Sequence, residues 1–483
     1  MAEPIAHNVT DPNEAGGVSA RAGLLALGTV GAGLLNYIYA LGMTHILDRE
    51  GYAVFAAGQG LILIEGVIGS AGVAWVLAQA VSRAKASGES PAAAVNFTFW
   101  VNMWAGLVFA VTMGGAALTF APASDAFVVA ATGFTLAASS TGLGYLQGMG
   151  LTERIAVVLV AEVLIKCVSG FVLVLLGMGS VGALLGNLLG AVVPFASLPM
   201  YARFIGRPTW RLGDKNLWRA AGRISGLQGA VGAASTVDAI LVAATPATAA
   251  GAAAYQAAAT LGKIPLYLST AMGTAAFPLL GREGGRRVYA HTVAAYLYLG
   301  LFCVAALVTV PRELMLFLFN DNFADTVRWL PPTAALGVLI GLFNILMTCD
   351  QAHELSRRAV LKRLAGAVMI ALATAVGARE WGIHGMVIAA CGALAVVMIL
   401  VGGTSIQRGG LIDAVKNLVL SGKILVLAPT YVLLRAVSAP IGWLVCSAGL
   451  GVLSLLIAFP ELRPAFLQRH RRRRVYAGSR RAD

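Results

Sequence analysis

The sequence predicts an all-α polytopic membrane protein, built from two pseudo-symmetric six-helix lobes and an extra C-terminal helix pair. Three observations predict this class: the composition, an internal repeat, and the series of long apolar segments. Hydrophobic residues make up 58% of the chain and charged residues only 12%, whereas soluble domains carry about 25% charged residues. Because the mean hydropathy is +0.79, the chain must place most of its surface in lipid.

The internal repeat relates two apolar segments at a constant offset. The matching pairs are Gly51 with Gly251, Phe55 with Tyr255, Ala57 with Ala257, Leu61 with Leu261 and Ile64 with Ile264. Since the register is the same at every pair, we interpret the chain as a duplicated lobe. Two related helix bundles in one membrane chain are typical of transporters, in which one bundle rocks against the other around a central site.

Apolar segments long enough to cross a bilayer follow one another along the chain, about 14 of them. Grouped as six, six and two, they predict the domain boundaries. These are a disordered leader 1–19, a first lobe 20–203, an amphipathic linker 204–218, a second lobe 219–402, a helix pair 403–460 and a basic tail 461–483. Tryptophan and arginine alternate in the linker, which is typical of an element in the membrane interface. A plain basic linker is the alternative.

The distribution of Lys and Arg predicts the orientation, because cytoplasmic loops retain positive charge during insertion. With both termini in the cytoplasm, the arginines left outside are Arg49, Arg312, Arg328, Arg379 and Arg435. The net charge of +13 is therefore mainly a topology signal. We expect the tail 469–474 to bind anionic lipid headgroups, and no nucleic acid as a partner.

Several absences narrow the class. The cysteines (Cys167, Cys303, Cys349, Cys391 and Cys446) lie in or beside apolar segments without CxxC spacing, so we expect neither disulfides nor zinc. There is no Walker motif, and the short external loops contain no paired carboxylates. We expect a protein that is not an enzyme, has no cofactor and no metal site, and draws on an ion gradient, the membrane potential or the substrate gradient.

Charged side chains inside the apolar segments are the candidate site residues, because such groups are costly in lipid unless they pair or face water. Glu162 and Lys166 lie one helical turn apart and can pair. Lys263 has Asp238 as its expected partner and precedes Pro265, which interrupts helix hydrogen bonding. Either lysine can bind a phosphate as a point charge. The alternative in both cases is a purely structural ion pair.

Two further groups of residues are candidates. Glu65 lies deep in its segment without a nearby base, and a buried carboxyl group of this kind is suited to proton coupling. A protonated structural Glu65 is the alternative. At the cytoplasmic ends of segments, Arg219, Arg223, Asp350 and Glu354 are candidates for an entrance or gate. The position of Asp350 and Glu354 just before Arg357 favours a solvated surface cluster instead.

The residues resemble a known family. The stretch from Tyr37 to Arg83, which contains HILDREGYAVFAAGQGLILIEG, resembles the start of Wzx-type polysaccharide flippases, where a turn of pattern lgpeeyGlf joins the first two helices. The stretch VDAILVAATPATAAGAAAYQAAATLGKIPLYLS is similar to the Asp at the end of that family's seventh helix and the Gly-x-Tyr-like start of the eighth. The resemblance covers roughly residues 20–400.

The resemblance implies the multidrug/oligosaccharidyl-lipid/polysaccharide exporter (MOP) superfamily, in which two six-helix lobes form a V around a central cavity. Its polysaccharide branch moves polyprenyl-diphosphate-linked oligosaccharides to the outer leaflet for cell-surface polysaccharide and cell-wall assembly. The lipid II branch also has two extra C-terminal helices, but its intramembrane arginines in the first lobe are missing here. The resemblance thus implies a flippase for a polyprenyl-diphosphate-linked oligosaccharide, and the missing arginines argue against lipid II as its substrate.

Two other functions stay open at this point. One is an ion-coupled multidrug or small-molecule antiporter of the same superfamily, and the other is a membrane scaffold that transports nothing. For the flippase, the expected partners are the polyprenyl-diphosphate oligosaccharide, anionic lipids and polysaccharide polymerases or glycosyltransferases. We expect a monomer in the bacterial plasma membrane, with both termini in the cytoplasm.

Overall fold

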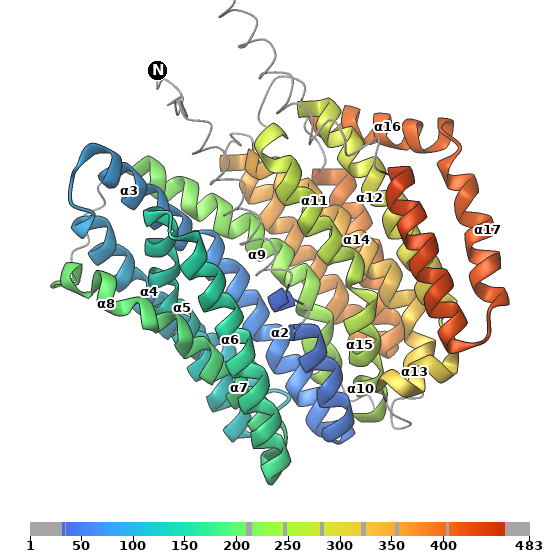
Figure 1. The fold of residues 1–483 in the computed structure, drawn as a ribbon, viewed down its shortest axis with the longest axis horizontal. Coiled ribbons are helices and arrows are strands. Elements are labelled where there is room, and N and C mark those ends of the chain that lie inside the picture. Colours follow the sequence, from blue (N-terminus) through green and yellow to red (C-terminus); the bar gives the residue numbers. More distant parts are fainter. Residues whose placement is uncertain are drawn as a thin grey trace, which may run out of the picture. The chain divides into compact units, whose positions relative to one another are not determined.

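The computed structural model describes residues 31–33, 35–208, 215–244, 249–280, 285–319, 325–352, 357–401 and 405–458. Every regular element within these ranges is a helix (Figure 1). The prediction of an all-α protein is therefore confirmed. The predicted leader, the middle of the predicted linker and the basic tail lie outside the described residues.

The chain divides into two compact units, Met1–Leu47 with Leu61–Ser225, and Asp48–Gly60 with Gly226–Asp483. Two helices continue from one unit into the other: α2 (Arg49–Ala71) and α9 (Lys215–Ala244). The second unit includes the first half of α2, which the predicted lobe boundaries place in the first lobe. A Cβ atom at Gly60 would lie 3.7 Å from the Thr236 Cβ atom on α9, so this half of α2 packs closely on the second unit.

The first unit contains a helix over residues 35–46 followed by a series of long helices. They are α3 (Val73–Ser87), α4 (Ala92–Ala117), α5 (Ala123–Met149), α6 (Thr152–Leu173), α7 (Gly179–Val192) and the short α8 (Leu198–Tyr201). A π-helical turn, Val174–Met178, joins α6 to α7, and 3₁₀ turns Val193–Ser197 and Ala202–Phe204 flank α8.

The second unit contains the remaining helices and a last helix over residues 440–458. They are α10 (Ala249–Gly262), α11 (Ile264–Leu280), α12 (Gly285–Val308), α13 (Arg312–Phe319), α14 (Thr326–Ala352), α15 (Arg357–Val401), α16 (Ser405–Leu420) and α17 (Lys423–Ala436). Within this unit, α14 packs against α10, α11 and α12. Its core includes Tyr296, whose hydroxyl donates to the Val338 carbonyl oxygen at 2.8 Å.

Eight helices of the described residues are long and apolar enough to cross a membrane, or nine if the bent pair Gly409–Leu420 and Lys423–Ala436 is one crossing. The protein is thus an integral membrane protein. Two of these helices, Thr152–Phe204 and Arg357–Leu400, have 53 and 44 residues, whereas one crossing needs about 20. The total of about 14 crossings remains a prediction.

Both of these long helices contain an interruption with non-helical backbone angles. Gly177 has a φ of 88° between α6 and α7, and Gly382 has a φ of 62° inside α15. A residue with a side chain is strained in this left-handed region, whereas glycine adopts it freely. These glycines therefore allow the chain to leave one helical segment and begin the next.

Close helix packing in the first unit depends on small residues where α3 meets α5. A Cβ atom at Gly144 would lie 2.7 Å from the Ala74 carbonyl oxygen. At Gly148 it would lie 2.6 Å from the Val81 Cβ atom and 2.7 Å from the Ala78 carbonyl oxygen. The two helix backbones can approach this closely only because these positions lack side chains, as is common between membrane helices. We call this contact the α3–α5 seam.

The two copies of the internal repeat are both helical but differ in where the helix is interrupted. The helix α2 covers Arg49–Ala71, and α10 is described over Ala249–Gly262. Each is followed by a one-residue break, at Gly72 before α3 and at Lys263 before α11. Since Lys263 matches Leu63, which lies inside α2, the two copies are interrupted at different repeat positions.

The seam makes a testable prediction about stability. Replacing Gly148 with alanine should lower the free energy of unfolding by about 1–3 kcal/mol, because the added methyl group overlaps α3. The measurement is the thermal unfolding midpoint in detergent. Gly115→Ala on α4 is the matched control, since a Cβ atom there meets nothing within 4 Å. Equal midpoints for the two variants would contradict a close seam.

Candidate functional site

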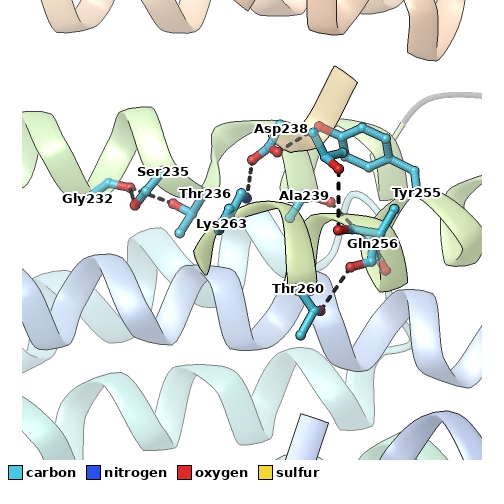
Figure 2. A network of polar contacts seen from close by, with 11 residues as sticks. Gly232, Ser235, Thr236, Asp238, Ala239, Tyr255, Gln256, Thr260 and Lys263 are labelled. Carbon is cyan, nitrogen blue, oxygen red and sulfur yellow. Dashed lines mark hydrogen bonds and ion pairs between the residues drawn. The ribbon is translucent and has the colours of Figure 1, made fainter. Parts of the chain in front are cut away.

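A buried ion pair forms the centre of the candidate site in the second unit. The Lys263 Nζ atom lies 2.8 Å from Asp238 Oδ1, and the Tyr255 hydroxyl donates to Asp238 Oδ2 at 2.8 Å. Figure 2 shows these side chains converging from α9, α10 and the break that follows α10. Both carboxylate oxygens of Asp238 thus accept a hydrogen bond. The sequence prediction that Asp238 is the partner of Lys263 is correct.

The local sequence explains why Lys263 lies at a break. Pro265 has no backbone N–H group, so it cannot donate to the carbonyl oxygen four residues earlier. The regular hydrogen bonding of α10 ends with the Lys263 N–H, which donates to the Ala259 carbonyl oxygen at 3.0 Å. After the break, the Leu266 N–H donates to the Lys263 carbonyl oxygen at 3.0 Å and α11 continues.

Small residues on α14 pack against this break. A Cβ atom at Gly337 would overlap the Gly262 carbonyl oxygen and lie 3.3 Å from the Lys263 Cα atom. One turn earlier, the Thr333 hydroxyl lies 3.3 Å from the Ala258 carbonyl oxygen that accepts its hydrogen bond. The absence of a side chain at Gly337 therefore lets α14 support the backbone that carries Lys263.

The side chains of the pair differ in exposure. The exposed fraction is 15% for the Lys263 side chain and 2% for that of Asp238. A buried ion pair gains little net stability, because desolvation of both charges offsets their attraction. Loss of one partner is costly, since it leaves the other charge buried alone. Of the two partners, Lys263 is therefore the more exposed and Asp238 the more deeply buried.

An aromatic cluster adjoins the buried end of the pair. The Tyr255 and Trp329 rings pack edge to face with their centres 5.8 Å apart, and the centres of the Trp329 and His384 rings are 4.5 Å apart. The Arg328 guanidinium lies 2.8 Å from His384 Nε2, and both of these side chains are exposed. The packed rings bury Tyr255, which has 0% of its surface exposed.

The other intramembrane lysine lies in the first unit and has different partners. The Lys166 ammonium on α6 donates to Asn36 Oδ1 at 2.7 Å and lies 5.1 Å from the centre of the Tyr39 ring. The Tyr39 hydroxyl donates to the Ala183 carbonyl oxygen on α7 at 2.6 Å. The helix over residues 35–46 therefore supplies both the amide and the aromatic face that hold this cation.

Glu162 does not form the ion pair that its spacing from Lys166 suggests. Within the described part of the chain, the Lys166 ammonium bonds to Asn36, and no salt bridge joins it to Glu162. Four-residue spacing places two side chains on one helix face, but an acceptor on a neighbouring helix can compete. Glu162 and Lys166 therefore share one face of α6, as predicted, and their charges interact there without a direct salt bridge.

Glu65 on α2 is almost completely buried, with 1% of its surface exposed. Its Oε2 atom has no hydrogen-bond partner among the described residues. Burial without a partner is costly for a carboxylate and tolerable for a neutral carboxyl group. The structure therefore places Glu65 inside the apolar segment, as the sequence predicts, close enough to Glu162 for the two carboxyl groups to interact electrostatically.

The predicted cluster at the end of α14 is a second buried ion pair. Asp350 and Arg363 are 1% and 3% exposed, and the Arg363 guanidinium binds both Asp350 oxygens. Beside them, Gln228 Nε2 donates to Gln351 Oε1 at 3.2 Å. The expectation that this cluster is solvated is wrong for Asp350, because Arg363 on α15 lies over it and excludes water.

The other candidates for the entrance differ in exposure and do not form a common cluster among the described residues. Arg219 on α9 is exposed, whereas one turn later Arg223 is partly buried and its Nε atom lacks a hydrogen-bond partner among the described residues. Glu354 lies outside the described residues.

The residues that the sequence reasoning missed are the neutral partners of the charges. Tyr255 is a repeat position, and Asn36 is one of many polar residues in the apolar segments. Neither has a signal in the sequence that links it to a lysine or a carboxylate. Only the position of Tyr255 between Asp238 and Lys263, beside a predicted break, could have indicated its role.

The described fold is similar to that of solved membrane transporters. For the lipid II flippase MurJ in an inward closed conformation, the TM-score is 0.59 at 13% identity, covering 91% of this chain and 100% of MurJ. For a MATE family multidrug resistance transporter of the MOP superfamily in an inward-facing conformation, the TM-score is 0.54 at 15% identity, covering 81% of this chain and 94% of the transporter. For a MATE transporter of Vibrio cholerae, the TM-score is 0.52 at 15% identity, covering 84% of this chain and 99% of that transporter. These likenesses define the fold class.

The chain belongs to the polysaccharide biosynthesis protein family, whose sequence profile matches residues 19–283. Together with the fold, this match confirms the predicted resemblance to the MOP superfamily. No protein of curated function matches the chain.

The buried pair makes a prediction about stability. Asp238→Ala should lower the free energy of unfolding by about 3–5 kcal/mol, because Lys263 is left buried and unpaired. Adding Lys263→Met should restore most of the loss, since no buried charge then remains. The measurement is a double-mutant cycle of unfolding in detergent.

The control cycle uses Arg286 and Asp413, whose charged atoms are also 2.8 Å apart but whose side chains are 55% and 41% exposed. Each single variant of this exposed pair should cost less than about 1 kcal/mol. Equal coupling energies for the two pairs would show that burial of the Asp238–Lys263 pair has no energetic effect.

Proposed function

We propose that the protein is a flippase, which moves polyprenyl-diphosphate-linked oligosaccharides from the cytoplasmic to the outer leaflet by alternating access. The observation that carries the proposal is the partly exposed Lys263 ammonium, held by Asp238 at a helix break in an apolar segment. Membership of the polysaccharide biosynthesis protein family supports a saccharide substrate, and the likeness to a lipid II flippase supports a fold suited to such a lipid.

The chemistry of the substrate fits this site. A diphosphate-linked saccharide cannot cross hydrocarbon unaided because its charges and hydroxyl groups would lose their hydration, whereas its polyprenyl tail can remain in lipid. The protein needs to shelter only the headgroup. The Lys263 ammonium, which lies within an apolar segment, would attract the diphosphate as a point charge. Lys166 in the first unit is the second cation available for this purpose, with Glu162 on the same helix face.

Several features of the proposal follow from the membrane class. We place the protein in the bacterial plasma membrane as a monomer with cytoplasmic termini, and with anionic lipids bound by its basic tail. Polysaccharide polymerases and glycosyltransferases are the proposed neighbours in cell-surface polysaccharide assembly. Arg219, Arg223, Asp350 and Glu354 stay proposed as residues of the cytoplasmic entrance.

The test is headgroup exposure in proteoliposomes that contain a fluorescent polyprenyl-diphosphate oligosaccharide and receive a membrane-impermeant sugar-modifying reagent. The variant is Lys263→Met with Asp238→Asn, which removes both charges and leaves no buried ion. We expect at least about a tenfold slower exposure, because about 1.4 kcal/mol of lost anion stabilisation already gives that factor. Lys416→Met on the exposed face of α16 is the control and should transport normally.

Unchanged exposure in the double variant would refute the assignment of the cationic site. No exposure by the folded wild-type protein with any polyprenyl substrate would refute the flippase itself. In that case a membrane scaffold would be favoured if the protein also transports no other compound.

A second candidate function is ion-coupled antiport of drugs or other small molecules. The observation that favours it is Glu65, which is buried and has an oxygen without a hydrogen-bond partner among the described residues. A carboxyl group in such a place can take up and release a proton during a transport cycle. The same residue can couple a flippase to a proton gradient, so the substrate distinguishes the two functions.

The prediction for Glu65 compares two substrates in the same proteoliposomes. In Glu65→Gln, headgroup exposure should persist but should no longer accelerate when a proton gradient is imposed, because the amide cannot exchange a proton. Initial rates with and without the gradient measure this loss. Gradient-driven movement of a cationic dye by the wild type, without any headgroup exposure, would instead identify an antiporter.

A further inference from the structure

A pocket at one end of the first unit brings two cations together where one long helix ends and the next begins. It has a volume of about 360 Å³. Lys85 of α3 lines one side, and residues 149–154, which form the turn from α5 into α6, line the rest. This pocket shares no residue with the Asp238–Lys263 pair, and we call it the α5–α6 pocket.

The α3–α5 seam places Lys85 at the wall of the pocket. The Lys85 ammonium donates to the Met149 carbonyl oxygen at 3.0 Å, and Met149 directly follows Gly148 of the seam. An ammonium group has three N–H donors, and this bond uses one of them. Among the described residues the Lys85 side chain has no further partner. Its position is therefore fixed while two of its donors remain for a ligand.

Arg154, in the first turn of α6, supplies the second cation. Its Nη1 atom lies 3.2 Å from Met200 Sδ, and a thioether is only a weak acceptor. The other donors of this planar guanidinium have no acceptor among the described residues. The lining also includes the carboxylate of Glu153, which forms no salt bridge with either cation in the described part of the chain. The pocket thus carries two positive charges and one negative charge.

The start of α6 adds backbone donors to the same pocket. No side chain caps this end of the helix, and its first backbone hydrogen bond joins the Ile155 N–H to the Leu151 carbonyl oxygen at 3.2 Å. The N–H groups of residues 152–154 therefore lack an acceptor within the helix. The Thr152 hydroxyl oxygen is buried and also has no hydrogen-bond partner among the described residues. Several donors thus lack the acceptor that a ligand oxygen would supply.

The length of α5 indicates the depth of the pocket in the membrane. This helix has 27 residues and is apolar enough to cross the bilayer, and at 1.5 Å per residue it is about 40 Å long. That length matches a bilayer including its headgroup regions, about 40–45 Å. The pocket at the end of α5 therefore lies at the level of the lipid phosphates.

We propose that the α5–α6 pocket binds the phosphate group of an anionic phospholipid, through Lys85, Arg154 and the first turn of α6. Phosphate oxygens are hydrogen-bond acceptors, and their negative charge is favoured by both cations and by a helix N-terminus. The volume lies at the lower end of the range for ligand pockets, about 300–1,000 Å³, so it suits a headgroup whose acyl chains remain in the bilayer. The inference goes beyond the proposed function and does not depend on it.

A phosphate group reaches this pocket either on a lipid or as the free ion, so the experiment uses two probes, phosphatidylglycerol and inorganic phosphate. Each is titrated against the full-length protein in detergent, and native mass spectrometry measures the fraction of protein with one or more bound ligands. The thermal unfolding midpoint of each variant, compared with that of the wild type, confirms that the variant folds.

Lys85→Gln and Arg154→Gln should each weaken phosphatidylglycerol binding about three- to tenfold, because each removes charge-assisted hydrogen bonds to the phosphate. Arg207→Gln is the matched control. Arg207 is exposed and lies at the same end of the first unit, where its carbonyl oxygen accepts from Asn96 near the start of α4 at 2.9 Å. It does not line the pocket, so its variant should bind like the wild type.

Glu153→Gln tests the sign of the effect. Removal of this carboxylate from the lining should tighten phosphatidylglycerol binding about two- to threefold, because it repels the phosphate. Glu89→Gln makes the same change in charge just after α3, outside the pocket, and should have a smaller effect.

Tighter binding of phosphatidylglycerol than of inorganic phosphate, with losses in Lys85→Gln and Arg154→Gln, supports a lipid site. The same losses with tighter binding of inorganic phosphate would support a site for the free ion and overturn the lipid assignment. Equal affinities in Arg154→Gln, Lys85→Gln and Arg207→Gln would overturn the site itself, because attraction to the basic surface as a whole would then explain the binding. Absence of binding by the folded wild type would overturn it as well.

Discussion

The interaction on which the candidate site depends is the ion pair between Asp238 and Lys263. An isolated charge in an apolar surrounding is unfavourable by several kcal/mol, so each of these groups requires the other. Because Tyr255 donates to the second carboxylate oxygen, the pair leaves neither oxygen of Asp238 without a partner. The helix break at Lys263, the glycine on α14 that supports it and the rings packed on Tyr255 are all arranged around this requirement.

The two halves of the repeat share buried packing positions, such as Leu61 and Leu261, but differ in chemistry. The positions that match Tyr255 and Lys263 are Phe55 and Leu63, which have no polar atoms, and the position that matches Pro265 is Glu65. The first copy therefore has the carboxyl group of Glu65 where the second has a proline next to its cation. The two copies of the repeat thus have similar apolar residues at their packing positions but ionisable residues at different positions. Each copy therefore offers a different chemical function.

The sequence predicted the class of protein, the repeat and the residues that carry charge in the apolar segments, because composition and periodicity report burial directly. It predicted Asp238 as the partner of Lys263 because few acidic residues are available nearby. It did not predict that Asn36 and Tyr39 hold Lys166, since contacts between helices distant in sequence have no periodic signal. The burial of Asp350 on α14 was not predicted for a similar reason. Arg363 covers it from α15, and this contact depends on the packing of α15 against α14.

The Asp238–Lys263 pair also bears on how a carrier can release what it binds. An unpaired lysine in an apolar site would hold a diphosphate too tightly, because leaving it would again expose a lone buried charge. In the proposed cycle, the carboxylate of Asp238 neutralises the lysine whenever the site is empty, so the departing anion leaves no uncompensated charge behind. The net free energy of binding is then the difference between the interaction energies of two ion pairs, Lys263 with the diphosphate and Lys263 with Asp238. This difference is smaller than either interaction energy alone. Since transport requires similar affinity on both sides of the membrane, a competing internal anion suits a transporter better than a strong permanent site.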